Sequence, residues 1–148
     1  MRLLKYILVI IVMFASSLFS QAEMANQGNN KGPQFYFDAS TTVVPDNPEL
    51  TRLSVFIELQ NDELQFVKTS DGYEAAYEIV VVILGKDNDQ VDGKIWKEEI
   101  FVEQYDATNL RNKLNLSYDK FDLEHGDYQL NVMVQDLETE IESKQTKK

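Results

Sequence analysis

The sequence predicts an all-β fold, an antiparallel β-sandwich of about seven strands, and three observations support this prediction. Apolar and polar residues alternate with a period of two over most of the chain from residue 34 onward, which is the pattern of half-buried strands. Clusters of Gly, Asn, Asp and Pro separate these segments at near-regular spacing, as they do in sandwich proteins. Helical periodicity is weak everywhere, and residues 106–113 are expected to form one helical turn at most.

The first two strands are expected at residues 34–39 and 53–59. In the first, Phe35 and Phe37 point to one face, while Tyr36 and Asp38 point to the other. In the second, alternate residues are aliphatic, as at Ile57. Each segment therefore has one face that suits a core.

A long third strand is expected at residues 73–83, followed by a turn at 85–90 and a fourth strand at 93–102. The second half of the third strand is apolar on both faces, because Val80 and Val82 lie opposite the Ile79 face. This pattern predicts a central strand that is covered on both sides. The two strands form a hairpin with a loop longer than the two-residue minimum. Trp96 in the fourth strand is expected to help organise the core, with half-exposed packing as the alternative.

Three later strands complete the prediction, near residues 114–116, at 128–134 and around Ile141. Tyr128 begins the second of these after Gly126-Asp127, the position at which an Ig-like sandwich carries a tyrosine corner. The basic residues near the last strand are expected to protect an edge from pairing with other chains; they are Lys144, Lys147 and Lys148.

The N-terminal segment predicts export. A short basic start is followed by the apolar run 6–19 and by Ser20-Gln21-Ala22, the order of a secretory signal peptide cleaved before Glu23. The run is shorter than the roughly 20 residues that span a bilayer, although an uncleaved membrane anchor is the alternative. The expected organisation is a signal peptide at 1–22, a polar linker at 23–33 and the sandwich at 34–148, with no stable membrane insertion after cleavage. A periplasmic, outer-membrane-associated or extracellular location follows.

Composition and charge exclude several classes of function. The chain has 148 residues, no cysteine and one histidine, so disulfides, thiolate zinc sites and cysteine nucleophiles are excluded. Its net charge is −11, and removal of Arg2 and Lys5 with the signal makes the rest more acidic still. Nucleic acid is therefore not an expected partner, because phosphate binding needs clustered Lys and Arg. No glycine-rich phosphate loop is present either, and no cofactor is expected.

The loop at residues 85–93 contains the only metal candidates, which are weak calcium ligands: Asp87, Asp89 and Asp92. Their spacing fails the EF-hand pattern, because Val91 and Asp92 stand where the fifth and sixth loop residues should be an acid or amide and a glycine. Asp, Asn and Gly are also the residues that a hairpin turn needs. A plain turn is therefore favoured over a metal site.

No complete catalytic set is recognisable. His125 has acidic neighbours and is a general base, a pH switch or, as we favour, a solvent-facing turn residue. The pair Glu98-Glu99 is consecutive within a strand, so its side chains point to opposite faces and cannot flank one glycosidic bond. An aromatic set is expected to pack in the core, with a carbohydrate or peptide groove as the alternative; it consists of Phe35, Tyr36, Phe37, Tyr73 and Tyr77.

The chain resembles the N-terminal β-sandwich region of the GWxTD-domain proteins, which are exported bacterial proteins. The segments that carry the resemblance extend over most of residues 34–148: Asp62–Lys68, Gly72–Ile79, Trp96, Tyr105–Asn109, Phe121–Leu123, Gly126–Tyr128 and Asp136–Glu138. The Gly-Trp-x-Thr-Asp motif itself is absent, since Ile95 precedes Trp96. The resemblance implies an exported sandwich that is the front part of a longer protein, and it implies no catalytic residues.

The expected function is that of a non-enzymatic, exported Ig-like β-sandwich. It would serve as an interaction or structural module of the bacterial cell envelope, with a protein or an envelope polymer as its partner. Two alternatives are an accessory domain that positions a downstream GWxTD-type region and a secreted, inhibitor-like sandwich that blocks a hydrolase through a loop.

Overall fold

Two antiparallel sheets face each other in the computed structural model, which describes residues 31–148. The strands are β1 (Phe35–Val44), β2 (Asn47–Gln60), β3 (Val67–Lys68), β4 (Tyr73–Leu84), β5 (Gln90–Val102), β6 (Leu114–Glu124), β7 (Gln129–Asp136) and β8 (Glu142–Lys147). Two 3-10 turns, η1 (Asn61–Glu63) and η2 (Tyr105–Asn109), complete the described elements. The predicted signal peptide at 1–22, and the predicted linker as far as residue 30, lie outside the described residues.

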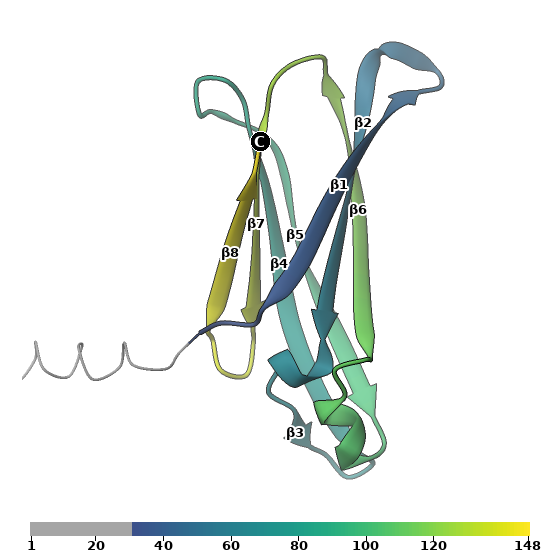
Figure 1. The fold of residues 1–148 in the computed structure, drawn as a ribbon, viewed down its shortest axis with the longest axis vertical. Helices are drawn as coiled ribbons and strands as arrows, with labels where there is room; N and C mark the ends of the chain where they lie inside the picture. Colours follow the sequence, from purple (N-terminus) through teal and green to yellow (C-terminus); the bar gives the residue numbers. More distant parts are fainter. Residues whose placement is uncertain (1–30) are drawn as a thin grey trace, which may run out of the picture. The chain divides into compact units, whose positions relative to one another are not determined.

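Sheet A has the strand order β1-β2-β6, and sheet B has β4 at its centre (Figure 1). One side of β4 pairs with β5, and the other side pairs with β7, which in turn pairs with β8. The short strand β3 pairs with the first two residues of β4. This arrangement confirms the predicted all-β antiparallel sandwich, with eight strands in place of about seven.

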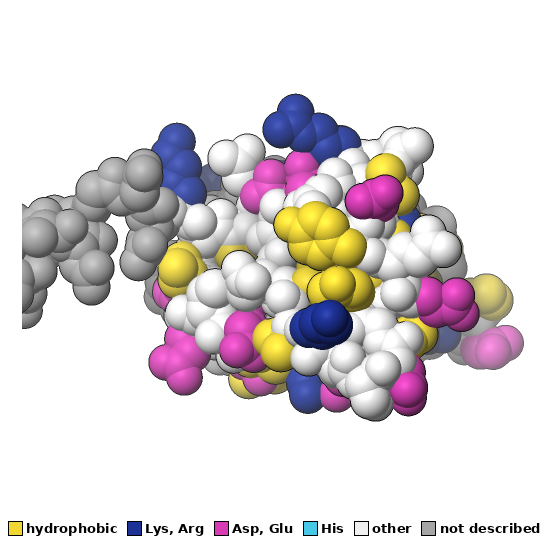
Figure 2. Space-filling model, turned by 90° about the horizontal axis from the view of Figure 1, so that it is seen from below, with side chains coloured by type: hydrophobic (Ala, Val, Ile, Leu, Met, Phe, Trp, Pro, Cys, Tyr) yellow, Lys and Arg dark blue, Asp and Glu magenta, His cyan; other side chains and the backbone are white. Residues whose placement is uncertain are grey.

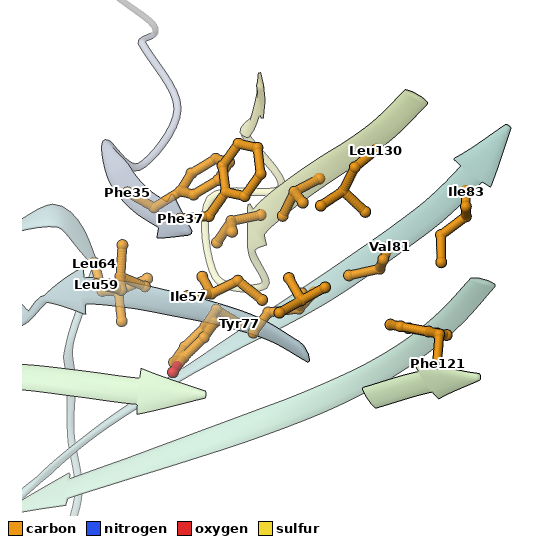
Figure 3. Close-up of a cluster of buried hydrophobic side chains, with 14 of the residues drawn as sticks. Phe35, Phe37, Ile57, Leu59, Leu64, Tyr77, Val81, Ile83, Phe121 and Leu130 are labelled. Carbon is orange, nitrogen blue, oxygen red and sulfur yellow. The ribbon is translucent and has the colours of Figure 1, made fainter. Parts of the chain in front are cut away.

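The core lies between the two sheets and is built from alternate residues of β1, β2, β4, β6 and β7, together with Leu64 (Figure 3). Phe35 and Phe37 of β1 are buried, as predicted, against residues of β2 and β4 such as Ile57 and Ile79. Complete burial of one such side chain stabilises the fold by roughly 1.5–3 kcal/mol. The period-two pattern of the sequence is therefore the main determinant of the fold.

The prediction for β4 is half confirmed. The strand is central, because it has hydrogen-bonded neighbours on both sides. The expectation that its second half is covered on both faces was wrong: Val80 and Val82 are half-buried on the outer face of sheet B. The described residues form only two layers, so the shielding of these valines comes from neighbouring side chains of the same sheet.

Trp96 has the half-exposed packing that was the alternative to burial in the core. It points toward sheet A from β5, where it is half-buried and packs against the margin of the core. Its indole Nε1 donates a hydrogen bond to Glu98 Oε1 at 3.1 Å. The reason is the position of β5 at the edge of sheet B, where one side of the ring has no neighbouring strand.

Two polar contacts fix the turns around β7. The Tyr128 hydroxyl donates to the carbonyl oxygen of Glu124 at 2.9 Å, which confirms the predicted tyrosine corner. The buried carboxylate of Asp136 accepts hydrogen bonds from the backbone N–H groups of Gln65, Glu138 and Thr139 at 2.7–3.2 Å. Buried polar groups need such partners, and these bonds hold the connections before β4 and after β7.

The end of the sandwich near η2 carries mixed chemistry. Apolar side chains gather at the centre of this end, with charged side chains around them (Figure 2). The rings of Tyr73 and Tyr105 meet edge to face there, with centroids 5.6 Å apart. The predicted helical turn at 106–113 is found as η2, slightly earlier in the chain.

No helix among residues 31–148 is both long enough and apolar enough to cross a membrane.

Candidate functional site

In β6 the apolar residues switch from even to odd positions within one regular strand: Leu114, Leu116 and Tyr118 are followed by Phe121 and Leu123. Its pairing with β2 runs without a register shift, so its side chains must alternate between the two faces throughout. Phe121 and Leu123 point into the core, which forces Leu114, Leu116 and Tyr118 onto the outer face. This change of phase without a bulge is the sequence signal of an exposed apolar surface, and the sequence analysis missed it.

Neighbouring strands extend this surface into what we call the sheet A patch. Its members are large hydrophobic residues that remain exposed on the outer face of sheet A: Tyr36, Phe56, Leu114, Leu116 and Tyr118. Tyr36 and Leu116 are 62% and 64% exposed, more than most large hydrophobic side chains of the described residues. A contiguous exposed apolar surface of this kind commonly marks an interaction site.

Cross-strand register places the members of the patch next to one another. Asp38, Phe56 and Tyr118 form one row across β1, β2 and β6, and Tyr36, Glu58 and Leu116 form the adjacent row. The Phe56 and Tyr118 rings are in contact, with centroids 5.0 Å apart and planes tilted by 34°. These two rings therefore form a rigid centre for the patch.

Charged groups surround the patch, and most of them are already paired. Arg52 and Asp122 form a two-point ion pair at 2.7 and 2.8 Å, and the Arg52 guanidinium lowers the pKa of the Asp122 carboxyl. Lys147 of β8 lies 2.6 Å from Asp38 and lowers the pKa of that carboxyl in the same way. Within residues 31–148, neither Glu58 nor Lys120 on this face makes an ion pair. Glu58 is the one that lies within a row of the patch, between Tyr36 and Leu116, whereas Lys120 lies in the next row beyond Phe56 and Tyr118.

The weak calcium candidates lie in the connection between β4 and β5. Asp87 and Asp89 are exposed in the turn, and Asp92 already belongs to β5, where its Oδ1 accepts the N–H of Gly93. The turn is closed by a bond from Gly85 N–H to the Asp89 carbonyl, with Asn88 at φ 60°. No group of three His, Asp or Glu side chains that could hold a metal ion occurs in the described part of the chain.

The remaining polar candidates predicted from the sequence do not form one site. His125 is exposed in the turn between β6 and β7. Glu98 points toward sheet A, where its Oε1 accepts hydrogen bonds from Trp96 and, at 3.3 Å, from the hydroxyl of Ser117. Glu99 points outward and pairs with Lys97 at 2.7 Å. The prediction that the two carboxylates face opposite ways is confirmed.

The aromatic set considered in the sequence divides between core and surface. Phe35, Phe37 and Tyr77 are buried, Tyr73 is half-buried, and Tyr36 is exposed. The set as a whole therefore lines no groove. Tyr36 instead joins Phe56 and Tyr118, which the sequence analysis had not grouped with it, because their proximity depends on the pairing of β1, β2 and β6.

A cleft of about 630 Å³ opens between the sheets at the end opposite η2. Its base is aliphatic, with Leu53, Ile83 and Leu130, but its rim mixes cations such as Lys86 with anions such as Asp127. The size suits a small ligand. The mixed signs of its rim select no class of ligand, so the sheet A patch remains the stronger candidate.

Comparisons with known proteins identify no family. No protein-family model matches the chain, and no curated protein matches it by sequence. Among solved structures, a calcium-binding mutant of Bacteroides uniformis β-glucuronidase 2 is similar over 80% of this chain and 13% of that chain, with a TM-score of 0.48 and 11% identity. A putative β-galactosidase from Bacteroides fragilis is similar over 80% and 16%, with a TM-score of 0.44 and 13% identity. The chain thus spans a small fraction of both of these larger proteins.

Proposed function

We propose that this chain is an exported, non-enzymatic interaction module of the bacterial cell envelope, which docks a protein partner on the sheet A patch. The observation that carries the proposal is the exposure of five large hydrophobic side chains on one regular sheet face. Protein interfaces are enriched in aromatic anchors surrounded by polar side chains. Export is supported by the signal-like sequence at 1–22.

The charge around the patch indicates the kind of partner surface. Glu58 lies between Tyr36 and Leu116 in one cross-strand row, and the whole chain has a net charge of −11. Complementarity of potential accelerates association and selects partners. The proposed partner therefore presents an apolar surface bordered by Lys or Arg side chains.

Site-specific photocrosslinking in the native cell tests the proposal. A benzophenone amino acid replaces Leu116 in one variant and, as a control, Tyr105 in another; the two positions are 64% and 60% exposed. We expect a crosslinked protein of discrete mass from position 116 and none from position 105. Glu58→Lys in the same background should reduce the yield, because it reverses the charge that faces the partner.

Three results would overturn the proposal. They are the absence of any adduct at position 116, the same adducts at both positions, and an adduct that is resistant to protease and sensitive to glycan-degrading enzymes. The last result would assign the patch to an envelope polymer.

A further inference from the structure

The strand β5 is an edge of sheet B with unpaired backbone groups. It pairs with β4 only, among the described residues. The N–H of Leu137 donates to the Ala76 carbonyl, so the backbone of Ala76 points away from β5. Along a strand, successive residues direct their backbone N–H and C=O groups alternately toward one neighbouring strand and toward the other. Glu99, the partner of Ala76, therefore directs its backbone groups outward from the sheet, as do Ile95, Lys97 and Phe101.

The side chains at these same four positions form a self-complementary series. Along the outer face of sheet B the order is Ile95, Lys97, Glu99 and Phe101, which is apolar, basic, acidic and apolar. A second copy running antiparallel places Phe101 opposite Ile95 and Glu99 opposite Lys97. Ile95 and Phe101 are 62% and 49% exposed in the single chain, and this pairing would shield both.

We propose that two copies of this chain associate through β5, in antiparallel pairing about a two-fold axis at Glu98. The proposal concerns a different surface from the sheet A patch and does not depend on it. Isologous pairing of this kind is the commonest symmetry of homo-oligomers. It also explains why a strand of 13 residues with a free edge carries exposed apolar side chains, which soluble proteins otherwise avoid.

Charge selects this register over its neighbours. A shift of two residues in one direction places Lys97 opposite Lys97, and a shift in the other direction places Glu99 opposite Glu99. Like charges directly opposite each other destabilise a strand pair. Among these registers, which use the same free backbone groups, only the one centred on Glu98 pairs opposite charges.

On the inner face, Trp96 lies opposite Ile100 of the second copy, and both side chains are half-buried in the single chain. Glu98 faces its own counterpart on the axis, which is the one unfavourable contact. Its carboxylate is drawn toward β6 by the hydroxyl of Ser117 at 3.3 Å and is also bonded by the Trp96 indole. Glu98→Gln removes the repulsion between the two carboxylates and keeps an oxygen that accepts the Trp96 and Ser117 hydrogen bonds. The substitution should therefore tighten the dimer, and this effect is expected only if the two Glu98 residues face each other.

Charge exchange tests the association. Sedimentation of the purified protein without its signal-like residues 1–22, over a concentration series, should show a monomer–dimer equilibrium. Lys97→Glu and Glu99→Lys, taken singly, should each weaken dimerisation about tenfold or more, because each change places two like-charge pairs in the interface. The double variant should restore it. Exchange of Glu142 and Lys144, an ion pair on the opposite edge strand, is the matched control and should change nothing.

Single cysteines test the register, because the chain contains no cysteine of its own. Residues opposite each other in a non-hydrogen-bonded pair are close enough for a disulfide. Glu98→Cys should therefore form a disulfide-linked dimer with oxidised glutathione, faster than Lys97→Cys or the β8 control Lys144→Cys. The proposal is overturned if the chain is monomeric at every concentration. Failure of the double charge exchange to restore dimerisation, or faster coupling at position 97, would overturn it equally.

Discussion

The hydroxyl of Tyr128 is a single group whose removal tests how the turn before β7 is held. It donates to the Glu124 carbonyl at 2.9 Å, and the ring packs over Gly126, where an added Cβ would lie 3.3 Å from the hydroxyl. Tyr128→Phe should lower the free energy of unfolding by about 1 kcal/mol, the usual net value of such a bond.

Urea denaturation checks this prediction. Tyr118→Phe is the matched control, because that exposed hydroxyl lies 3.5 Å from Ser54 and makes at most a weak bond. A loss for Tyr128→Phe no larger than that for Tyr118→Phe would show that the corner contributes nothing to stability.

Tyr77 makes the stability of the fold decrease at alkaline pH. Its hydroxyl lies 3.3 Å from that of Ser117, and burial raises the pKa of the phenol above its ordinary value of 10.0. The unfolded chain therefore releases this proton at lower pH than the folded chain does. The associated stability is complete below about pH 10 and is lost as the pH rises toward the folded-state pKa.

Denaturation at pH 9 and pH 11 measures this effect. Tyr77→Phe should be less stable than the parent at pH 9, because it loses a hydrogen bond. It should also lose less stability between the two pH values, because it has no proton to release at that position. Equal losses in the two proteins would contradict the assignment.

At the scale of single elements, β4 and β5 allow a comparison of how much a central strand and an edge strand contribute to the free energy of unfolding. Ile79 and Trp96 are direct cross-strand partners, but Ile79 is fully buried and Trp96 is half-buried. Ile79→Ala should cost about 2–5 kcal/mol. Trp96→Ala should cost only about 1–3 kcal/mol, below the usual range for a buried aromatic residue.

The same unfolding assay compares the two variants. A loss for Trp96→Ala as large as that for Ile79→Ala would mean that the indole is enclosed in solution, for example by a second β5 strand. Repetition of the Trp96→Ala measurement in the Lys97→Glu background would distinguish that case, because the charge reversal removes the partner strand.

The strands themselves were largely predictable from the sequence, because alternation with a period of two determines which residues face the core. Phe35, Phe37 and the inward face of β4 follow this rule. Two features were not predictable. The exposure of Trp96 depends on the edge position of β5, and the patch around Phe56 and Tyr118 depends on which strands are neighbours. Both are properties of strand order, and the local pattern does not contain that information.

For the molecule as a whole, the ion pairs of its carboxyl groups predict sensitivity to low pH. Ion pairs lower the pKa of several carboxyl groups, including those of Asp38, Glu99 and Asp122, which are paired with Lys147, Lys97 and Arg52. A lowered folded-state pKa gives stability that is present above the unfolded-state value and is lost as the pH falls through the folded-state value. The melting temperature should therefore decrease when the pH is lowered beyond about 4.

Thermal unfolding at pH 6 and pH 3 in low salt checks this expectation. Arg52→Gln returns the Asp122 carboxyl toward its ordinary pKa, so this variant should lose less stability than the parent between the two pH values. An identical loss in both proteins would show that this pair does not couple folding to protonation.

The position of the patch on a face of the sandwich, rather than on one of its edges, has a consequence for avidity. The two-fold axis of the proposed dimer is perpendicular to the joined sheets, so both patches face the same direction. Two sites that point the same way can engage a densely populated surface together, and the second contact then forms at a high effective concentration. A docking site that binds weakly on one chain would thereby bind tightly in the bivalent dimer.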